Sequence, residues 1–290
     1  MEPVKMNGEL KTLNQVDKFL TQFAKDLKRP SNRDELAIDL SNLNFVSPIG
    51  AIALLLLFEK ISSLYKLKIT LPKSQQNLVS YIERINFFKH CPESVKNEFN
   101  KEYDIEVLSK RNRNDTRKVL LEITKIEEDD DVDTLFDSTI YILSSHGMRN
   151  EELNKIATIV SELATNIIDH SKATGYAAIQ YYPKFNKVVI GIADNGVGIV
   201  NTMKKVIKQG NDLDIIKQAF VGGMTSSLDM ERGWGLTDAR EYSYFETKST
   251  LFSIRTHKGL YAVDKENILE LSNSCYFPGT FFSIEINFMI

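Results

Sequence analysis

The sequence contains only two cysteines, Cys91 and Cys275, among its 290 residues. A disulfide framework or a zinc site built from cysteines needs more of them at closer spacing, so both are excluded. The longest apolar run, residues 49–58, is about half as long as a membrane-spanning helix, which needs ~20 residues. Residues 1–11 are polar and charged, unlike a signal peptide. We therefore expect a cytoplasmic protein with no membrane partner.

The sequence also lacks a large excess of charge of one sign. It contains 36 Lys and Arg residues and 39 Asp and Glu residues, which gives a formal net charge of −3. This balance argues against a nucleic-acid partner, which a strongly basic surface would favour. Hydrophobic residues make up 42% of the chain and charged residues 26%, as in globular proteins with full cores. The length favours two domains.

Apolar runs alternate with amphipathic stretches in the first third of the chain. The expected strands are residues 36–40 and 68–71, and the expected helices are residues 48–65 and 78–82. This alternation predicts a small α/β domain over residues 1–92. Residues 93–117 are polar and weakly periodic, so we expect them to form a linker.

The second domain is expected over residues 118–290, as an α/β sandwich with helices on one face of a mixed sheet. Its expected helices are residues 132–145 and 151–169, and its expected strands are residues 119–123, 177–181, 188–193, 251–255, 260–263 and 281–286. The acidic residues 127–133 are consecutive and cannot all converge on one ion. They are therefore interpreted as a solvated loop rather than a metal site.

Glu162, Asn166 and Asp169 are spaced i, i+4 and i+7 on the second of these helices, away from its apolar stripe. This spacing predicts that the three side chains share one helix face. Carboxylate and amide oxygens at such a place can hold Mg²⁺ and its waters beside a phosphate chain. Taken alone, the same residues are more simply an ordinary solvated face.

Asp194 follows an apolar strand and is followed by Gly196 and Gly198. The glycines permit close approach of the backbone to a ligand. The aspartate can accept a hydrogen bond from an exocyclic amine such as adenine N6. An Asx turn that closes the strand is the alternative.

Two glycine-rich stretches, residues 222–227 and 232–237, form the third motif. Their backbone N–H groups can cradle phosphate oxygens, and the second stretch opens an expected helix whose N-terminus favours anions. Thr225, Ser226 and Arg232 can add direct phosphate contacts. A glycine-rich linker is the alternative, but the order of the three motifs predicts one nucleotide pocket.

These motifs resemble those of the GHKL ATPase superfamily, which includes DNA gyrase and the ATP-binding domains of histidine kinases. Residues 162–170 resemble its N box, residues 194–199 its first glycine box and residues 232–236 its second. Residues 278–280, Pro-Gly-Thr, resemble its closing element. The spacing Glu-x-x-x-Asn-x-x-x-His is most similar to that of the anti-sigma-factor serine kinases.

The resemblance implies that ATP and Mg²⁺ bind, with Glu162 as the base or water-positioning residue and Asn166 as the Mg²⁺ ligand. It implies that Asp194 reads adenine and that residues 222–235 close as a lid. The residues that it implies contact the nucleotide are Asn166, His170, Asp194, Gly196, Gly198, Ile199, Thr225, Ser226, Arg232, Gly233, Gly235, Leu236 and Thr280.

Residues 145–149, Ser-His-Gly-Met-Arg, faintly resemble the phosphoacceptor motif of histidine kinases. In that family the motif lies on a separate helical hairpin, far before the N box. Here there is no room for the hairpin, so His146 is interpreted as a helix-end residue.

Residues 39–50 resemble the signature of STAS domains, the anti-sigma-antagonist fold. That family carries a phosphorylated Ser or Thr before the glycine, and here Ile49 stands in its place before Gly50. Ser47 is interpreted as the N-cap of the helix that begins at Pro48, with a displaced phosphorylation site as the alternative. The domain is then expected to be a docking or dimerisation platform.

Three functions are compatible with these motifs. The first is a protein kinase that phosphorylates a Ser or Thr of a partner, such as a STAS-like or sigma-factor-like protein. The second is an ATP-driven conformational switch, with or without slow hydrolysis. The third is a scaffold that retains a structural nucleotide, and the intact Glu162 argues against it. A homodimer is expected.

Overall fold

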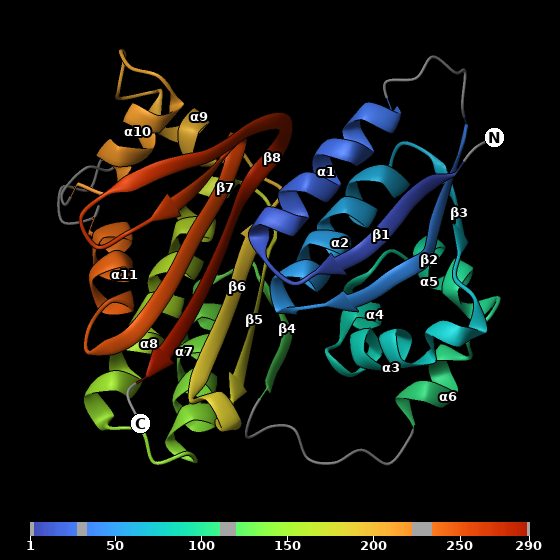
Figure 1. Cartoon of the computed structure of the whole chain (residues 1–290), viewed down its shortest axis with the longest axis horizontal. Helices are drawn as coiled ribbons and strands as arrows, with labels where there is room; N and C mark the ends of the chain where they lie inside the picture. The colour runs from blue at the N-terminus through green and yellow to red at the C-terminus, as the bar shows by residue number, and fades with distance from the viewer. Residues whose placement is uncertain (1–2, 28–33, 111–119, 222–233, 289–290) are drawn as a thin grey trace. The chain divides into compact units, whose positions relative to one another are not determined.

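The computed structural model describes residues 3–27, 34–110, 120–221 and 234–288. The chain divides into two compact units, Met1–Asn114 (unit 1) and Asp115–Ile290 (unit 2). Figure 1 shows unit 1 in blue to blue-green and unit 2 in green to red. Each unit combines one sheet with helices, which confirms the expected α/β class.

Unit 1 has a parallel sheet in the order β1-β2-β3, with Val4 paired to Ile38 and Leu36 to Leu67. Its described elements are β1 (Val4–Leu10), α1 (Leu13–Leu27), β2 (Glu35–Val46), α2 (Pro48–Ser62), β3 (Lys66–Thr70), a 3₁₀ helix η1 (Lys73–Gln75), α3 (Gln76–Arg84), α4 (Phe87–His90), α5 (Glu93–Asn100) and α6 (Ile105–Ser109).

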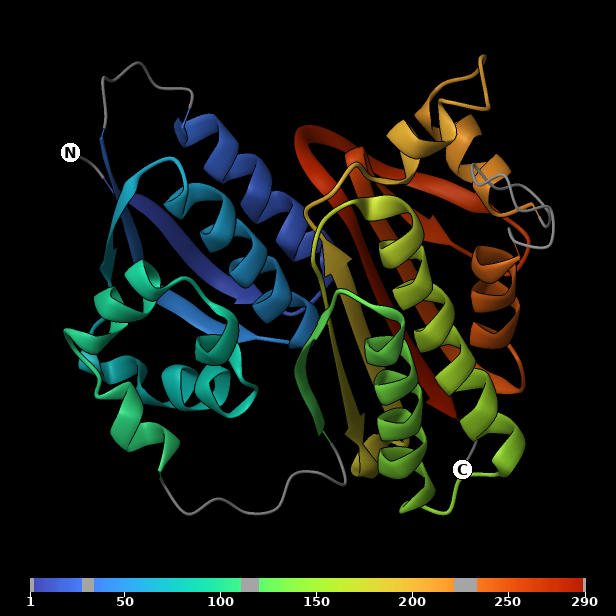
Figure 2. The ribbon, with the colours of Figure 1, turned by 180° about the vertical axis from the view of Figure 1, so that it is seen from behind.

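Helix α2 forms the centre of unit 1. It begins as predicted, because the Ser47 hydroxyl accepts a hydrogen bond from the Gly50 N–H at 3.3 Å and Pro48 occupies the first turn. Nearly every residue of α2 is buried, so the helix is apolar all round rather than amphipathic. Figure 2 shows α1 and α2 side by side along the sheet.

Neither β1 nor α1 was predicted, although the buried Val4, Met6 and Leu10 alternate with charged and polar residues, as in a half-buried strand. Residues expected to form a linker also fold onto unit 1 as α5 and α6. Phe99 of α5 is buried, and the Glu98 carboxylate accepts a hydrogen bond from the Ile69 N–H at 3.2 Å. These short helices show no clear hydrophobic periodicity, because each buries only two side chains.

Unit 2 has an antiparallel sheet in the order β4-β5-β6-β8-β7. Its described elements are β4 (Leu120–Ile126), α7 (Asp129–Ser144), α8 (Asn150–Asn166), a π-helix η2 (Ile167–Ser171), β5 (Gly175–Tyr182), a 3₁₀ helix η3 (Pro183–Phe185), β6 (Lys187–Asp194), α9 (Ile199–Met203), α10 (Asp212–Ala219), α11 (Gly235–Ser243), β7 (Thr247–Val263) and β8 (Ile268–Phe288).

The expectation of a mixed sheet in unit 2 was wrong, since every pair of neighbouring strands is antiparallel. The connections explain two of these pairs. The turns between β5 and β6 and between β7 and β8 are too short for a crossover to a parallel strand. As expected, α7, α8 and α11 cover one face of the sheet (Figure 2).

The acidic residues 127–133 were expected to form a loop, but α7 already begins at Asp129. Glu128 and Asp131 form a capping box, in which the Glu128 N–H donates to Asp131 Oδ2 at 3.1 Å. Negative side chains stabilise a helix N-terminus, so this run starts a helix instead of preceding one.

A span of the lipid bilayer would require a long and strongly apolar helix. Within the described ranges, none of the helices meets that requirement.

Candidate functional site

Helix α8 carries the first predicted motif at its C-terminal end. The Asn166 side-chain N–H donates to the backbone oxygen of Glu162 at 2.8 Å. This bond fixes the orientation of the amide and leaves its oxygen Oδ1 as an acceptor on the other side. Mg²⁺ prefers a small number of oxygen ligands from protein, so the residue fits the predicted metal ligand.

The helix changes its winding directly after Asn166. Residues Ile167–Ser171 form a π-helix that includes Asp169 and His170. The expectation of one regular helix to Asp169 was therefore wrong, and a face shared by Glu162 and Asp169 no longer follows from their spacing. Single turns of π-helix are rare and occur often at functional sites.

The start of α11 packs directly on this motif. A Cβ atom placed on Gly235 would lie 2.4 Å from Glu162 Oε2 and 3.5 Å from Asn166 Nδ2, so a larger residue here would displace the Glu162 carboxylate. At the other end of the contact, the Lys155 ammonium lies 3.9 Å from the Phe245 ring centroid. The two helices therefore run antiparallel, and the second glycine motif meets the Glu–Asn pair.

The Glu162 carboxylate is half-buried in this helix contact. Burial raises its pKa above the ordinary value, and the negative charge of Asp238 raises it further. Asp238 lies three residues after Gly235 on α11 and so belongs to the same face of that helix. The arrangement makes Glu162 a stronger base than a solvated glutamate.

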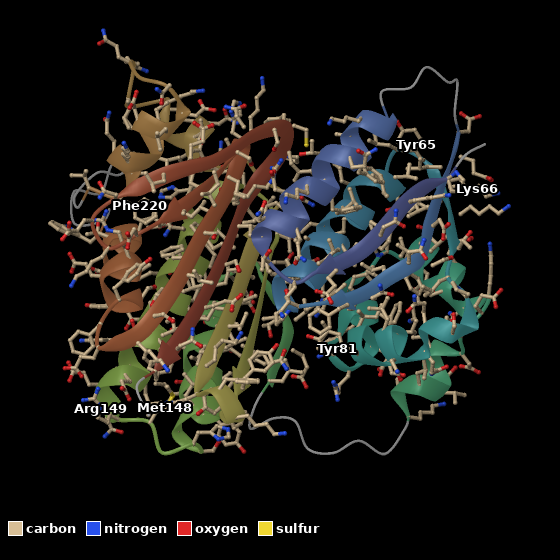
Figure 3. The ribbon with its side chains drawn as sticks, viewed as in Figure 1. Tyr65, Lys66, Tyr81, Met148, Arg149 and Phe220 are labelled. Atoms are coloured by element: carbon tan, nitrogen blue, oxygen red, sulfur yellow. The ribbon has the colours of Figure 1, made fainter. Side chains whose placement is uncertain are left out.

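The flanks of residues 222–233 are joined within unit 2. The Thr237 hydroxyl at the start of α11 donates to the backbone oxygen of Phe220, which follows α10, at 3.1 Å. Phe220 itself is buried against Phe252 (Figure 3). The predicted phosphate contacts Thr225, Ser226, Arg232 and Gly233 lie outside the described residues. Leu236 is buried in the core of unit 2.

A second cluster surrounds Asp194 at the end of β6. Its side chain is 3% exposed; Oδ1 accepts a hydrogen bond from the Gly196 N–H at 2.7 Å and Oδ2 accepts one from the Thr280 N–H at 3.2 Å. Burial raises the pKa of this carboxyl, while the hydrogen bonds from Gly196, Ser171 and Thr280 act in the opposite direction. Asp194, the residue predicted to recognise adenine, therefore also forms the Asx turn that closes the strand.

Glycines allow three chain segments to meet at this cluster. A Cβ atom on Gly196 would lie 2.0 Å from the Ser171 backbone oxygen, and one on Gly279 would lie 1.9 Å from the Asp194 backbone oxygen. Gly198 and Gly279 also have positive φ angles. The Val197 N–H donates to the Ser171 oxygen at 2.9 Å, so η2 connects the cluster to the end of α8.

Thr280 and Ile199, which the motifs predict to contact the nucleotide, also lie in this cluster. The Ile199 N–H donates to the Thr280 hydroxyl oxygen at 3.1 Å. The Thr280 hydroxyl in turn donates to Thr256 Oγ1 at 3.3 Å, and Thr256 is fully buried. Sequence reasoning missed Thr256, because its place depends on the register between β7 and β8 and not on any local motif.

The region with a resemblance to a phosphoacceptor lies away from both clusters. Arg149 precedes the first residue of α8 and Asn166 is the last, so the two are separated by a helix about 25 Å long. Figure 3 shows Met148 and Arg149 together, and Arg149 forms ion pairs with Glu152 and Glu246. His146 follows the end of α7 as predicted, and its ring contacts Tyr181.

In unit 1, the residue at the expected phosphorylation position is inaccessible as well as chemically inert. Ile49 is 0% exposed. Its neighbour Gly50 is held so close to β1 that a Cβ atom would lie 2.0 Å from the Leu10 backbone oxygen. The Ser47 hydroxyl, besides capping α2, donates to the same oxygen at 3.2 Å, which favours the structural interpretation of Ser47.

Comparison with known proteins adds no family to these observations. No protein-family model matches the chain, and no curated protein matches it either. The resemblance to the GHKL ATPases and to STAS domains stays a prediction from the motifs.

Proposed function

We propose that unit 2 binds ATP with Mg²⁺ and transfers the γ-phosphoryl group to a Ser or Thr hydroxyl of a partner protein. In this proposal the protein acts in the cytoplasm, in a partner-switching type of signalling. A STAS-like or sigma-factor-like protein is the proposed partner, and the chain is proposed to form a homodimer. Unit 1 would serve as the docking platform.

The contact of Gly235 with Glu162 and Asn166 is the observation that carries this proposal. Phosphoryl transfer needs a base, a metal ligand and backbone donors for phosphate oxygens at one place. Residues about seventy positions apart in the sequence meet there, and a Cβ atom on Gly235 would displace the Glu162 carboxylate. Packing against the start of a second helix distinguishes this pair from an ordinary solvated helix face.

Each residue has a distinct task in the proposed reaction. Asp194 accepts a hydrogen bond from the adenine amine, and Asn166 Oδ1 would hold Mg²⁺, which would offset the negative charge of the phosphates. Glu162 takes the proton of the partner's hydroxyl. That oxygen then bonds to the γ-phosphorus as the bond to the β,γ-bridging oxygen breaks, and ADP leaves.

A conformational switch without phosphoryl transfer is the alternative. The same Gly235 contact supports it, because a ligand bound to Glu162 or Asn166 acts on side chains that lie against the start of α11. In that case ATP changes partner affinity or oligomeric state, and no phosphoprotein forms.

The first experiment tests nucleotide binding. Trp234 is the only tryptophan in the sequence, is 54% exposed and immediately precedes Gly235. ATP with Mg²⁺ should change its fluorescence and raise the melting temperature, because a ligand that binds only the folded state stabilises it. A protein that shows neither change under saturating ATP does not have the proposed pocket.

The second experiment tests the chemistry with γ-labelled ATP and candidate STAS-like acceptors. Glu162→Ala should lower labelling by about 10²–10⁴-fold and retain ATP binding. Glu151→Ala is the matched control, since Glu151 lies on the same helix and is exposed beside Lys155. Labelling by Glu162→Ala at the control rate would eliminate the proposed base. ATP-dependent partner binding without labelling in the wild type would favour the switch.

A further inference from the structure

Thr256 lies where strands β7 and β8 lose their regular pairing. Thr256 pairs with Thr280, but the next pair along β7 is His257 with Phe277. Two residues of β8, Pro278 and Gly279, are therefore extra and form a bulge. The bulge brings Gly279 against the Asp194 backbone. Thr256 contacts the other side of this arrangement, because its hydroxyl bonds to the Gly279 oxygen.

The hydroxyl groups of Thr280 and Thr256 form a series of hydrogen bonds in which only one donor order is possible. Thr256 Oγ1 donates to the Gly279 backbone oxygen at 3.1 Å. A carbonyl oxygen can only accept, so the single proton of Thr256 is used there and its oxygen is left to accept. The Thr280 hydroxyl therefore donates to Thr256, and its own oxygen accepts from the Ile199 N–H.

These hydrogen bonds determine whether the Thr280 hydroxyl can donate to a ligand or only accept from it. A hydroxyl has one donor and two acceptor positions. With its proton directed to Thr256 and one lone pair directed to Ile199, Thr280 presents an acceptor only. The Asp194 carboxylate is also an acceptor when ionised. Both side chains then match a donor on the base, such as the amine of adenine, and repel the oxo group that guanine and hypoxanthine carry at the same position.

We infer that Thr256 is a specificity-determining residue, which makes the nucleotide site select 6-amino over 6-oxo purines by orienting the Thr280 hydroxyl. It acts through Thr280 and is thus a positioning residue rather than a contact to the base. The inference rests on the proposed binding of ATP at Asp194 and extends it from the motif residues to a side chain on another strand.

Removal of the Thr256 hydroxyl separates this role from simple packing. Thr256→Val keeps the shape of the side chain but cannot accept the Thr280 proton. Thr280 is then able to turn its proton towards the ligand, which weakens binding to a 6-amino base and favours a 6-oxo base. A purely structural role would weaken both nucleotides to the same extent.

The test measures dissociation constants of ATP and inosine triphosphate with Mg²⁺ by calorimetry, on the full chain. Inosine triphosphate is the probe because it carries an oxo group where ATP carries the amine. We expect Thr256→Val to reduce the preference for ATP by about fivefold or more, the worth of one hydrogen bond. Thr256→Ser, which restores the hydroxyl, should restore the preference.

Thr202→Val is the matched control. The Thr202 hydroxyl is also buried and donates to a glycine oxygen of the same cluster, Gly198, at 3.1 Å, but it has no bond to Thr280. Its removal should leave the preference unchanged. Thr256→Cys, which keeps the volume and weakens the hydrogen bonds, replaces the valine variant if circular dichroism shows that variant to be unfolded.

The possible results separate this inference from the proposed function. If the wild type binds ATP and the preference of Thr256→Val is unaltered, or changes no more than in Thr202→Val, the role of Thr256 is overturned while ATP binding stands. If the wild type binds neither nucleotide, the proposed function fails and the inference fails with it.

Discussion

The two units use buried polar side chains in different ways. In unit 1 the buried Ser47 caps α2 and bonds to β1, so its hydrogen bonds are directed to the chain itself. In unit 2 the buried Asp194, Thr256 and Thr280 gather at the end of β6, where β8 bulges towards it. In unit 1 the buried hydroxyl holds the fold, whereas in unit 2 the cluster provides the acceptors that the proposed ATP site needs.

Glycine substitution should give the largest contrast between the units. Gly279 and Gly8 both have positive φ angles, but a Cβ atom meets the Asp194 backbone at Gly279 and nothing within 4 Å at Gly8. Gly8→Ala should cost only the ~1–2 kcal/mol of the left-handed backbone. Gly279→Ala should cost more and abolish ATP binding. Denaturant unfolding and calorimetry measure both, and equal effects of the two variants would contradict the crowded cluster.

Introduction of the missing hydroxyl into unit 1 should harm the fold and create no switch. Ile49 is fully buried, so Ile49→Ser should lower the free energy of unfolding by about 2–5 kcal/mol, whereas Ile49→Val should cost about 0.5–1.5 kcal/mol. Neither variant should be labelled by γ-labelled ATP. A stable, phosphorylated Ile49→Ser protein would show that unit 1 retains an accessible phosphorylation site.

Removal of the cap should have a smaller effect. Ser47→Ala loses the hydrogen bond from the Gly50 N–H and should lower the free energy of unfolding by about 1 kcal/mol. ATP binding by unit 2 should be unaltered. Hydrogen exchange followed by mass spectrometry can locate the change, which is expected in α2. Weakened ATP binding with normal stability would instead assign Ser47 to function.

The smallest expected effect concerns pH. Because burial and Asp238 raise the pKa of Glu162, the base stays protonated to a higher pH than a solvated glutamate, and labelling should fall as pH decreases through that raised pKa. Asp238→Asn removes the second cause, so the acidic limb of the rate profile should move to lower pH. Glu151→Gln should leave the limb in place. If the acidic limb stays at the same pH in Asp238→Asn, the charge of Asp238 does not affect the pKa of Glu162.

Local patterns predicted the elements whose signals are contained in a few neighbouring residues. The strands β5 and β6 with their short turn, the cap of α2 by Ser47, and the glycines after Asp194 are examples. Two kinds of element were missed: β1, because residues 1–11 were interpreted only as polar and charged, and the short α5, which buries only two side chains. The antiparallel sheet of unit 2 was not predicted either, because β6 pairs with β8 over separations from 88 residues (Ala193 with Phe281) to 100 residues (Lys187 with Asn287).

The order and chemistry of Glu162, Asn166, Asp194 and Thr280 were determined by the sequence alone, since the identity of a side chain decides what it can donate, accept or ligate. Their assembly was decided only by the tertiary structure. The close approach of Gly235 to Glu162 depends on how α8 and α11 pack, and the direction of the Thr256–Thr280 hydrogen bond depends on a bulge between two strands. Both are relations between distant segments, and no short stretch of sequence contains them.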